Sequence, residues 1–591
     1  MSLSSNFPTI KPSLNLDFAN TKRLDPRVTF TRSTTGTYYD GVTTAMAEQN
    51  LALQSQAFGT SPWGVFNGSI SYDATTAPDG TSTADLMYPS GASVVTSASQ
   101  GAVTSTSDTT TISVYAKANG INNIWIISGN NSSAAVWFNV SAGTVGTTAG
   151  GYTASIVSVG SGWYRCIVTG SFNALQVGIS TSDGGYISSA SGTNGVYLWG
   201  CQVEVRSAAT AYTATTSQTI TNYIPVLLTA AANVPRFDHN PTTDESLGLL
   251  IEEQRTNLLS YSSDFANGYW DKYNISLTSN TIIAPDGTLT GEKIAADASS
   301  ISHYLYPASG VAVSAGTYTA SIYAKAGERT RLLAAIWNGS NYEIAQFDLS
   351  NGTIVQEAVA GIASITSVGN GWYRCSVKRT IGSVTTYFSF GPYINGTLGD
   401  LTGFPTYTGD GFNGIYIWGA QLEAGSFATS YIATTAASAT RNADAASMTG
   451  ANFTSWFNAG EGTFYGEANL SGGGRYFHAV KTGASDQIEG VQQTTYFEAF
   501  VYSTSIQAQI NIAVASFINR RVALAYQVND IAACVSGGTV SVDTNAILPL
   551  DLNAFYVNSY GTSGPLGSGT VKKVAYYPAR LTNAQLQAIT S

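Results

Sequence analysis

The segment Ser158-Val-Gly-Ser-Gly-Trp-Tyr-Arg-Cys166 recurs in this chain as Ser367-Val-Gly-Asn-Gly-Trp-Tyr-Arg-Cys375. In both copies a glycine turn leads into a run in which apolar and polar residues alternate, over residues 163–168 in the first copy. Successive side chains of a strand point to opposite faces, so a period of two predicts a half-buried β-strand. The segment therefore predicts a repeated β-structure.

The repeat extends to both sides of this segment, and its members keep the same order in both copies. The offset between the copies grows from 207 residues at the first pair to 219 at the last, so insertions totalling 12 residues lie in loops of the second copy. The recurring pairs are Asn50-Leu51 with Asn257-Leu258, Ala77-Pro-Asp-Gly80 with Ala284-Pro-Asp-Gly287, Ser113-Val-Tyr-Ala-Lys117 with Ser321-Ile-Tyr-Ala-Lys325, and Val196-Tyr-Leu-Trp-Gly-Cys-Gln-Val-Glu204 with Ile415-Tyr-Ile-Trp-Gly-Ala-Gln-Leu-Glu423.

The fold class predicted from these patterns is all-β. Alternating runs recur at 112–117, 136–140 and 196–205, separated by Gly, Asn and Ser turns, and no stripe with a helical period is sustained. Many short strands at such spacing are typical of a two-sheet sandwich or jelly roll. The 60 glycines and 34 tyrosines also favour strands and tight turns over helices.

The chain of 591 residues is too long for one core. We expect jelly-roll module 1 at 46–218, its homologue module 2 at 253–436, and an unrelated sandwich at 437–591. Residues 1–45 and 219–252 hold strand-like runs without a complete core, so they are predicted to pair with each other, with module 1 inserted between them. At the end of the chain, Thr582 and Gln585 have the spacing of a capping box and predict a short helix.

The composition excludes several classes of function. The chain has 26 basic and 36 acidic residues, a net charge of −10, and no run of basic residues. The sequence therefore predicts no basic surface for a phosphate backbone to bind. No run of about 18 apolar residues predicts membrane insertion, and the N-terminal segment lacks the pattern of a secretory signal. We therefore expect a soluble protein made in a cytoplasm that binds neither nucleic acid nor the membrane interior.

Four segments of the chain carry a resemblance to a known family. They are Leu24-Asp-Pro-Arg-Val-Thr-Phe-Thr-Arg32, Val234-Pro-Arg-Phe-Asp-His239, Leu249-Leu-Ile-Glu-Glu-Gln-Arg-Thr-Asn-Leu-Leu259 and Tyr416-Ile-Trp-Gly-Ala-Gln-Leu-Glu-Ala-Gly425. They resemble segments of structural proteins of tailed bacteriophages and prophages, the tail fibres and head fibres among them. The resemblance implies a virion protein, a fibre, spike or decoration, that is made in a bacterial host cytoplasm and forms a homotrimer. It also implies modules similar to carbohydrate-binding jelly rolls and a C-terminal domain similar to laminin-G or concanavalin-A folds. The expected partners are polysaccharide and, through a docking arm around residues 7–12, other virion proteins.

No motif of catalysis or metal binding is visible. The three histidines lie in separate segments without a ligand spacing, and no nucleophile elbow surrounds a serine or cysteine. The acidic stretch 238–245 reads as a turn rather than a calcium loop, so calcium is implied by the resemblance alone. The four cysteines predict buried free thiols, with a Cys166–Cys201 bridge as the alternative. No cofactor is expected, and the protein is predicted not to be an enzyme.

Aromatic residues are the better indication of a ligand, because sugar rings stack their C–H faces on tryptophan and tyrosine. Most recurring tryptophans are predicted to be core residues. Trp137 differs: its neighbours Val136 and Phe138 should face the core, so Trp137 and Asn139 should point outward, where the second copy has Gln346. Trp137 and Asn139 are therefore the predicted carbohydrate site, with packing on a neighbouring module or subunit as the equal alternative.

Two classes of function follow from the sequence. In the first, the modules attach a virion fibre or spike to host or environmental polysaccharide. In the second, the sandwiches are purely architectural spacers or oligomer contacts. A polysaccharide-degrading tailspike is an outsider, because the sequence shows no long parallel β-helix repeat.

Overall fold

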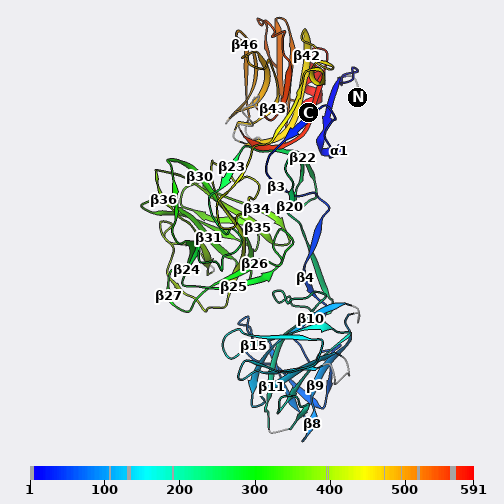
Figure 1. Ribbon diagram of the computed structural model, residues 1–591, viewed down its shortest axis with the longest axis vertical. Helices are drawn as coiled ribbons and strands as arrows, with labels where there is room; N and C mark the ends of the chain where they lie inside the picture. The colour runs from blue at the N-terminus through cyan, green and yellow to red at the C-terminus, as the bar shows by residue number, and fades with distance from the viewer. Residues whose placement is uncertain are drawn as a thin grey trace.

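Strands dominate the computed structural model, with 53% of residues in strands and 3% in helices, which confirms the all-β class. Figure 1 shows three bodies: the C-terminal domain carries both chain ends, module 2 lies beside it, and module 1 stands apart on a long ribbon. None of the helices among the described residues is long and apolar enough to span a membrane. The structure describes residues 6–104, 108–128, 135–189, 192–394, 396, 398–471, 473–493, 495–514, 519–559 and 567–591.

Module 1 is a sandwich of two six-stranded sheets, β14-β15-β10-β18-β7-β6 and β13-β12-β11-β16-β9-β5. Its core lies between the sheets and includes Ile112, Val114, Phe138 and Val177, all fully buried. The strands are β5 (Gly64–Phe66), β6 (Gly68–Thr75), β7 (Ala84–Pro89), β8 (Val94–Val95), β9 (Ser97–Ala102), β10 (Thr109–Asn119), β11 (Asn123–Ser128), β12 (Ala135–Asn139), β13 (Thr144–Thr148), β14 (Thr153–Ser158), β15 (Tyr164–Ser171), β16 (Ala174–Ser180), β17 (Ile187–Ser188) and β18 (Gly195–Glu204).

Module 2 repeats this topology strand for strand, with sheets β34-β35-β30-β39-β26-β25 and β33-β32-β31-β37-β28-β24 around an equivalent core. The tandem sandwich predicted from the repeat is thus confirmed. The strands are β23 (Arg255–Asn257), β24 (Trp270–Tyr273), β25 (Ile275–Ile282), β26 (Gly291–Ala296), β27 (Ser300–Ile301), β28 (Tyr304–Pro307), β29 (Val311–Val313), β30 (Gly316–Ala326), β31 (Arg331–Trp337), β32 (Tyr342–Asp348), β33 (Thr353–Glu357), β34 (Ala363–Gly369), β35 (Trp372–Ile381), β36 (Val384–Thr386), β37 (Phe388–Tyr393), β38 (Tyr407–Thr408), β39 (Gly414–Ala424) and β40 (Ala439–Arg441).

The same β-bulge interrupts the central strand pair of both modules. The register of β10 on β18 shifts between Ser113 and Tyr115, and Gly200 on the bulged strand has φ 59°. A Cβ at Gly200 would lie 3.0 Å from the Tyr115 ring, so only glycine fits beside it. Module 2 has the same shift and the same contact between Gly419 and Tyr323. The bulge therefore lays an equivalent tyrosine against the outer face of each module.

A two-stranded antiparallel ribbon carries module 1. Strand β4 (Thr44–Asn50) pairs with β19 (Ile220–Pro225), and β3 (Gly36–Tyr38) pairs with β20 (Leu228–Ala230). The chain thus enters and leaves module 1 through adjacent strands, which gives the inserted arrangement expected from the sequence. Asn50 fixes the end of the ribbon to module 1, because its side chain donates to the carbonyls of Cys201 and Thr213.

The remaining strands of 1–45 and 219–252 join the sheets of the C-terminal domain. Strand β1 (Leu14–Asp17) and β22 (Ser246–Ile251) both pair with β51 (Ser568–Tyr577), and β21 (Arg236–His239) extends the same sheet. Strand β2 (Thr29–Thr31) pairs with β41 (Ala445–Thr449). With helix α1 (Phe18–Thr21), they bury Leu16, Phe18 and Ile251 in the C-terminal core. These short segments have too few apolar residues for a separate core, so they complete one that already exists.

The C-terminal domain is a sandwich of an eight-stranded and a seven-stranded sheet. The predicted capping box of α3 is present. Its elements are β41 (Ala445–Thr449), α2 (Ala451–Thr454), β42 (Glu461–Ser471), β43 (Arg475–Val480), β44 (Gln487–Gln492), β45 (Tyr496–Ser503), β46 (Ser505–Ala513), β47 (Arg520–Gln527), β48 (Asp530–Val535), β49 (Ser541–Asp543), β50 (Ala554–Val557), β51 (Ser568–Tyr577) and α3 (Asn583–Thr590).

A buried ionic cluster, called here the arginine hub, joins the C-terminal domain to module 2. It consists of Arg32, Arg236, Arg441, Glu252 and Asp444, whose charged side chains are at most 3% exposed. Asp444 accepts from both Arg32 at 2.9 Å and Arg236 at 2.6 Å, and Glu252 lies between Arg236 and Arg441. Several of the residues that carry the phage-type resemblance therefore hold the domains together.

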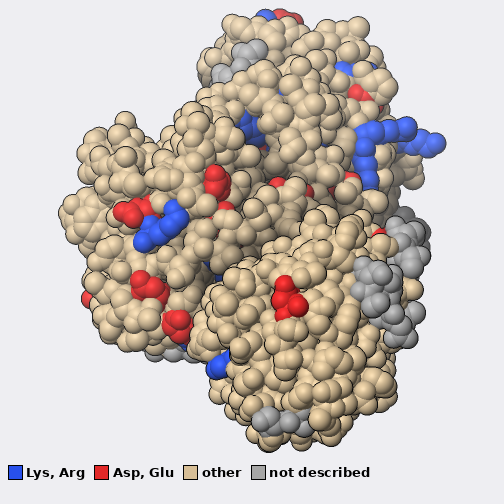
Figure 2. Space-filling model, turned by 60° about the horizontal axis from the view of Figure 1, so that its bottom comes forward, with Lys and Arg blue, Asp and Glu red and all other residues tan. Residues whose placement is uncertain are grey.

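The surface is formed mainly by uncharged residues. Figure 2 shows lysine, arginine, aspartate and glutamate scattered over one face without a continuous patch of either sign. This agrees with a charged content of only 10%.

Candidate functional site

The tryptophans that recur in both copies are buried, as the sequence predicted. Trp63 and Trp270 lie in the two sandwich cores, at 5% and 1% exposure. Four others lie in apolar clusters outside those cores, beside the bulge tyrosines: Trp163, Trp199, Trp372 and Trp418. Their recurrence in the sequence thus reflects packing.

Trp137 lies on the side of β12 opposite to the core residues, as alternation predicted, but its indole is not open to solvent. The side chain is 5% exposed, because the ring of Tyr186 packs against it at 5.0 Å between centroids. Its Nε1 donates to the Gly185 carbonyl at 2.7 Å. Contrary to the expectation of an open platform, the segment around Tyr186 covers the ring. A role in sugar binding stays a prediction.

Asn139 has a local structural role. Its Oδ1 accepts from the backbone N–H groups of Ser141 and Ala142 at 3.1 and 2.9 Å, which forms the turn after β12. Asp348 forms the equivalent turn in module 2 by accepting from the backbone of Ser350. The predicted role of Asn139 in carbohydrate binding stays a prediction as well.

The outer face of module 2 carries a cluster of side chains that the sequence-based reasoning missed. Strands β24, β28, β31 and β32, together with residues 387 and 404, place seven aromatic rings on the side of the sheet away from the core. All seven are partly exposed, Tyr273 to 37%. We call this set the aromatic face, and its members are Tyr273, Tyr304, Tyr306, Trp337, Tyr342, Tyr387 and Phe404.

Ring contacts connect the aromatic face from one side to the other. Tyr304 lies at the centre, stacked on Tyr273 at 5.0 Å and on Phe404 at 4.6 Å between centroids. Phe404 continues to Tyr342 at 5.5 Å, which contacts Trp337 at 4.9 Å. In the other direction, Tyr304 contacts Tyr306 at 5.5 Å and Tyr306 contacts Tyr387 at 5.8 Å. The rings thus form one continuous apolar surface.

Polar groups edge this surface. The Tyr306 hydroxyl donates to Asp271 at 2.8 Å, and the Ser389 hydroxyl donates to the Tyr342 hydroxyl at 3.3 Å. Burial among its neighbours raises the pKa of Tyr304 to about 12, so its hydroxyl remains protonated at neutral pH and is able to donate. A surface of apolar ring faces with hydroxyl and carboxylate edges matches the two kinds of group on a sugar.

Three positions of the aromatic face have no aromatic residue in module 1. The strand registers place Ser97, Ser99 and Ala174 of module 1 where module 2 has Tyr304, Tyr306 and Tyr387. The sandwich therefore folds without these tyrosines, and packing does not account for them. This difference between the copies, Ser-Ala-Ser against Tyr-Leu-Tyr, was the signal available in the sequence.

Both modules also carry an equivalent polar wall beside the bulge. In module 2, the Arg374 guanidinium lies over the Tyr323 ring at 5.3 Å, with Tyr431 beside it. In module 1, Arg165 and Tyr115 have the same geometry at 5.3 Å, and Tyr212 takes the place of Tyr431. Each wall borders a pocket, of about 800 Å³ in module 2 and about 980 Å³ in module 1.

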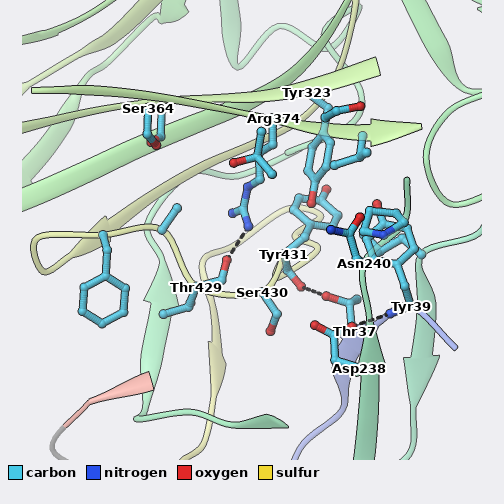
Figure 3. Close-up of a pocket in the computed structure, with 18 of the residues that line it drawn as sticks. Thr37, Tyr39, Asp238, Asn240, Tyr323, Ser364, Arg374, Thr429, Ser430 and Tyr431 are labelled. Atoms are coloured by element: carbon cyan, nitrogen blue, oxygen red, sulfur yellow. Dashed lines mark hydrogen bonds between the residues drawn. The ribbon is translucent and has the colours of Figure 1, made fainter. Parts of the chain in front are cut away.

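The two pockets lie at junctions between parts of the chain. The module 1 pocket is closed by module 2, through residues that include Thr281, Lys293 and Phe412. The module 2 pocket is closed by the N-terminal and returning strands, and Figure 3 shows Tyr39, Asp238 and other side chains facing the wall across it. Each repeated module thus supplies one wall of its pocket, and a different part of the same chain supplies the opposite wall.

No described group of three or more histidine, cysteine, aspartate or glutamate side chains is arranged to hold a metal ion. The histidines are 1 to 2% exposed, and each ring bonds nearby backbone or side-chain atoms: His239, His303 and His478. The acidic stretch 238–245 forms a turn in which Asn240 accepts from the backbone of Thr242. The four cysteines are buried free thiols, as predicted, so Cys166 and Cys201 do not pair.

The comparisons with known proteins give only weak similarities. No protein-family model matches the chain, and no curated protein matches it. Among solved structures, the tandem CBM22 domains of Paenibacillus barcinonensis Xyn10C share 11% identity at a TM-score of 0.18, covering 64% of this chain and 99% of that one. The LG1-3 region of the laminin alpha2 chain shares 10% at 0.19, covering 81% and 94%. A Trypanosoma rangeli sialidase shares 12% at 0.20, covering 50% and 60%. Such scores carry no argument about function.

Proposed function

We propose that this protein is a structural component of a tailed-bacteriophage virion, a fibre, spike or decoration, that attaches to host or environmental polysaccharide through the aromatic face of module 2. The observation that carries the proposal is the continuous row of seven partly exposed rings, three of which are replaced by serine or alanine in module 1. The virion assignment is supported by the resemblance of the hub segments to phage structural proteins.

The proposed attachment relies on stacking supplemented by hydrogen bonds. The apolar C–H faces of successive sugar units lie on the rings around Tyr304, while their hydroxyls bond to the exposed Asp271 carboxylate at the edge. An open face gives each chain modest affinity. Several copies on one particle then raise the avidity, because the second binding event is intramolecular.

Assembly into the virion is proposed to use the N-terminal arm. Phe7 and Ile10 are 57% and 38% exposed, so two apolar side chains stand free just before β1 is fixed to the C-terminal sheet. Exposed apolar groups on a tethered segment favour contact with a partner protein. A homotrimer is the proposed oligomer, since fibres assemble as closed symmetric oligomers.

The test replaces tyrosines of module 2 by the residues that module 1 has at equivalent positions, in the double variant Tyr304→Ser with Tyr306→Ser. Since module 1 folds with serines there, the variant should fold. We expect binding of the full-length protein to a host polysaccharide to weaken at least ten-fold, about 1.4 kcal/mol. Surface plasmon resonance on immobilised surface polysaccharide from the host measures this.

A matched control is Val359→Ala, which changes an apolar residue of module 2 that is 50% exposed and outside the aromatic face. It should bind like the wild type. Equal binding by the double variant and the wild type, with intact folding by circular dichroism, would contradict attachment through this face. That result would favour the purely architectural role, with which the arginine hub and the buried Trp137 are equally consistent.

A further inference from the structure

The module 2 pocket of Figure 3 has two chemically different ends. At one end lie Arg374 and Lys378, together with Ser364 and Ser376, whose hydroxyls bond each other at 2.6 Å. Lys378 is exposed and forms no ion pair with a carboxylate among the described residues. This end therefore offers positive charge and hydroxyl groups to a ligand.

Arg374 is held in place for such a role. Its Nη1 donates to the Thr429 carbonyl at 2.5 Å, and its Nη2 donates to the Ser321 hydroxyl at 3.0 Å. The Tyr323 ring supports the guanidinium plane. A guanidinium fixed through these bonds is pre-organised, so little conformational entropy is lost when an anion approaches it.

The opposite end of the pocket presents Tyr39, Asp238 and Asn240. Tyr39 is 8% exposed, and its hydroxyl has no hydrogen-bond partner in the part of the chain that the structure describes. An unpaired buried hydroxyl costs about 1 to 3 kcal/mol, unless a bound group pairs with it. Asp238 accepts from the Tyr39 backbone N–H at 2.9 Å and gives this end a carboxylate.

We propose that this pocket binds one sugar ring that carries a carboxylate. The carboxylate lies toward Arg374 and Lys378, and the ring hydroxyls pair with Tyr39, Asp238 and Asn240. The volume of about 800 Å³ accommodates such a ring together with neighbouring sugar units. Asp238 repels the ligand's carboxylate, which fixes the orientation of the ring. The proposal rests on the proposed binding of polysaccharide but concerns a site separate from the aromatic face.

The test uses the full-length protein with digalacturonate and, as the neutral counterpart, galactobiose, by isothermal titration calorimetry. Tyr39→Phe removes only a hydroxyl without a protein partner, so its melting temperature should equal or exceed that of the wild type. We expect its affinity for both sugars to fall about ten-fold. Lys378→Gln should weaken digalacturonate about five-fold and leave galactobiose unchanged.

The aromatic-face double variant separates this proposal from the proposed function. If it binds polysaccharide weakly but digalacturonate normally, the pocket is a distinct site. No binding of digalacturonate to the wild type at millimolar concentration would overturn the inference. Unchanged affinity in both Tyr39→Phe and Lys378→Gln would also overturn it. So would acetate binding as tightly as digalacturonate, because the site would then recognise only an anion.

Discussion

At the residue scale, each module buries one carboxylate at an equivalent position. Asp85 on β7 is 1% exposed and accepts from the backbone N–H groups of Phe58 and Asp73 at 2.8 and 3.1 Å. Glu292 on β26 is 3% exposed, and its Oε2 has no hydrogen-bond partner among the described residues. Burial raises the pKa of Asp85 to about 6 and that of Glu292 to about 7.

The sign of the resulting pH dependence follows from the direction of the shift. In the folded protein the pKa of Glu292 is about 7, whereas its ordinary value is 4.5. Burial raises this pKa most and Asp264 raises it further, while Lys272 lowers it in part. The folded state therefore binds more protons between these values. The stabilisation is complete below pH 4.5 and is lost as the pH rises toward 7 and above.

We predict that Glu292→Gln makes module 2 more stable than the wild type at pH 8 and removes about 3 kcal/mol of pH dependence between pH 4.5 and 8. Hydrogen exchange of the amides of β26 and β39 across this range measures the free energy of opening. Asp85, in the other module, serves as an internal reference, because its sheet should keep its own pH dependence. Parallel profiles for variant and wild type in β26 would refute the prediction.

At the element scale, α3 shows how much a short helix depends on its cap. Thr582 accepts from the Gln585 backbone at 3.3 Å, and the Gln585 side chain accepts from the Thr582 backbone at 2.9 Å. These bonds satisfy two N–H groups at the helix start. The helix buries Leu586 against the alanine-rich strands β47 and β48.

We predict that Thr582→Ala lowers the free energy of unfolding of the C-terminal domain by about 1 kcal/mol, because the N-cap bond is lost. Asn583→Ala, one position further on and exposed, should change it little. Urea denaturation followed by tryptophan fluorescence compares the two variants. Equal effects of both substitutions would show that helix propensity rather than capping sets the stability of α3.

At the scale of the whole molecule, the ribbon makes module 1 a separable part. The apolar cores of module 2 and the C-terminal domain contain no residue of module 1. The arginine hub likewise draws on segments outside it. The contacts between the modules include Ala211 N–H, which donates to the Thr281 carbonyl at 2.7 Å, and the ion pair of Lys325 with Glu48 on the ribbon.

We predict that replacing residues 51–219 by Asn-Gly, which closes β4 and β19 as a two-residue hairpin, leaves the rest of the protein folded. Differential scanning calorimetry should lose the transition of module 1 and keep the others. Digalacturonate binding should persist, because the module 2 pocket contains no residue of the deleted segment. Loss of all cooperative unfolding would show that module 1 is needed for the fold of the remainder.

The sequence by itself determined the features that depend on local pattern. Period-two alternation and glycine turns encode strands, and the recurrence of Trp63 and Trp270 marked core positions, because every copy of a core needs the same volume filled. The capping box at Thr582 was equally local. The repeat then fixed the number of modules and the insertion of the first.

Only the tertiary structure decided which distant segments meet. The sequence gives no register between β1 and β51, which lie at opposite ends of the chain, so it did not predict that these N-terminal strands complete the C-terminal sandwich. Trp137 lies on the predicted side of its strand, yet its exposure depends on Tyr186, which belongs to another segment. The aromatic face likewise forms because strands and a loop bring Tyr304 and Phe404 together. Side-chain direction is a property of one strand, whereas burial and a binding surface are properties of what packs beside it.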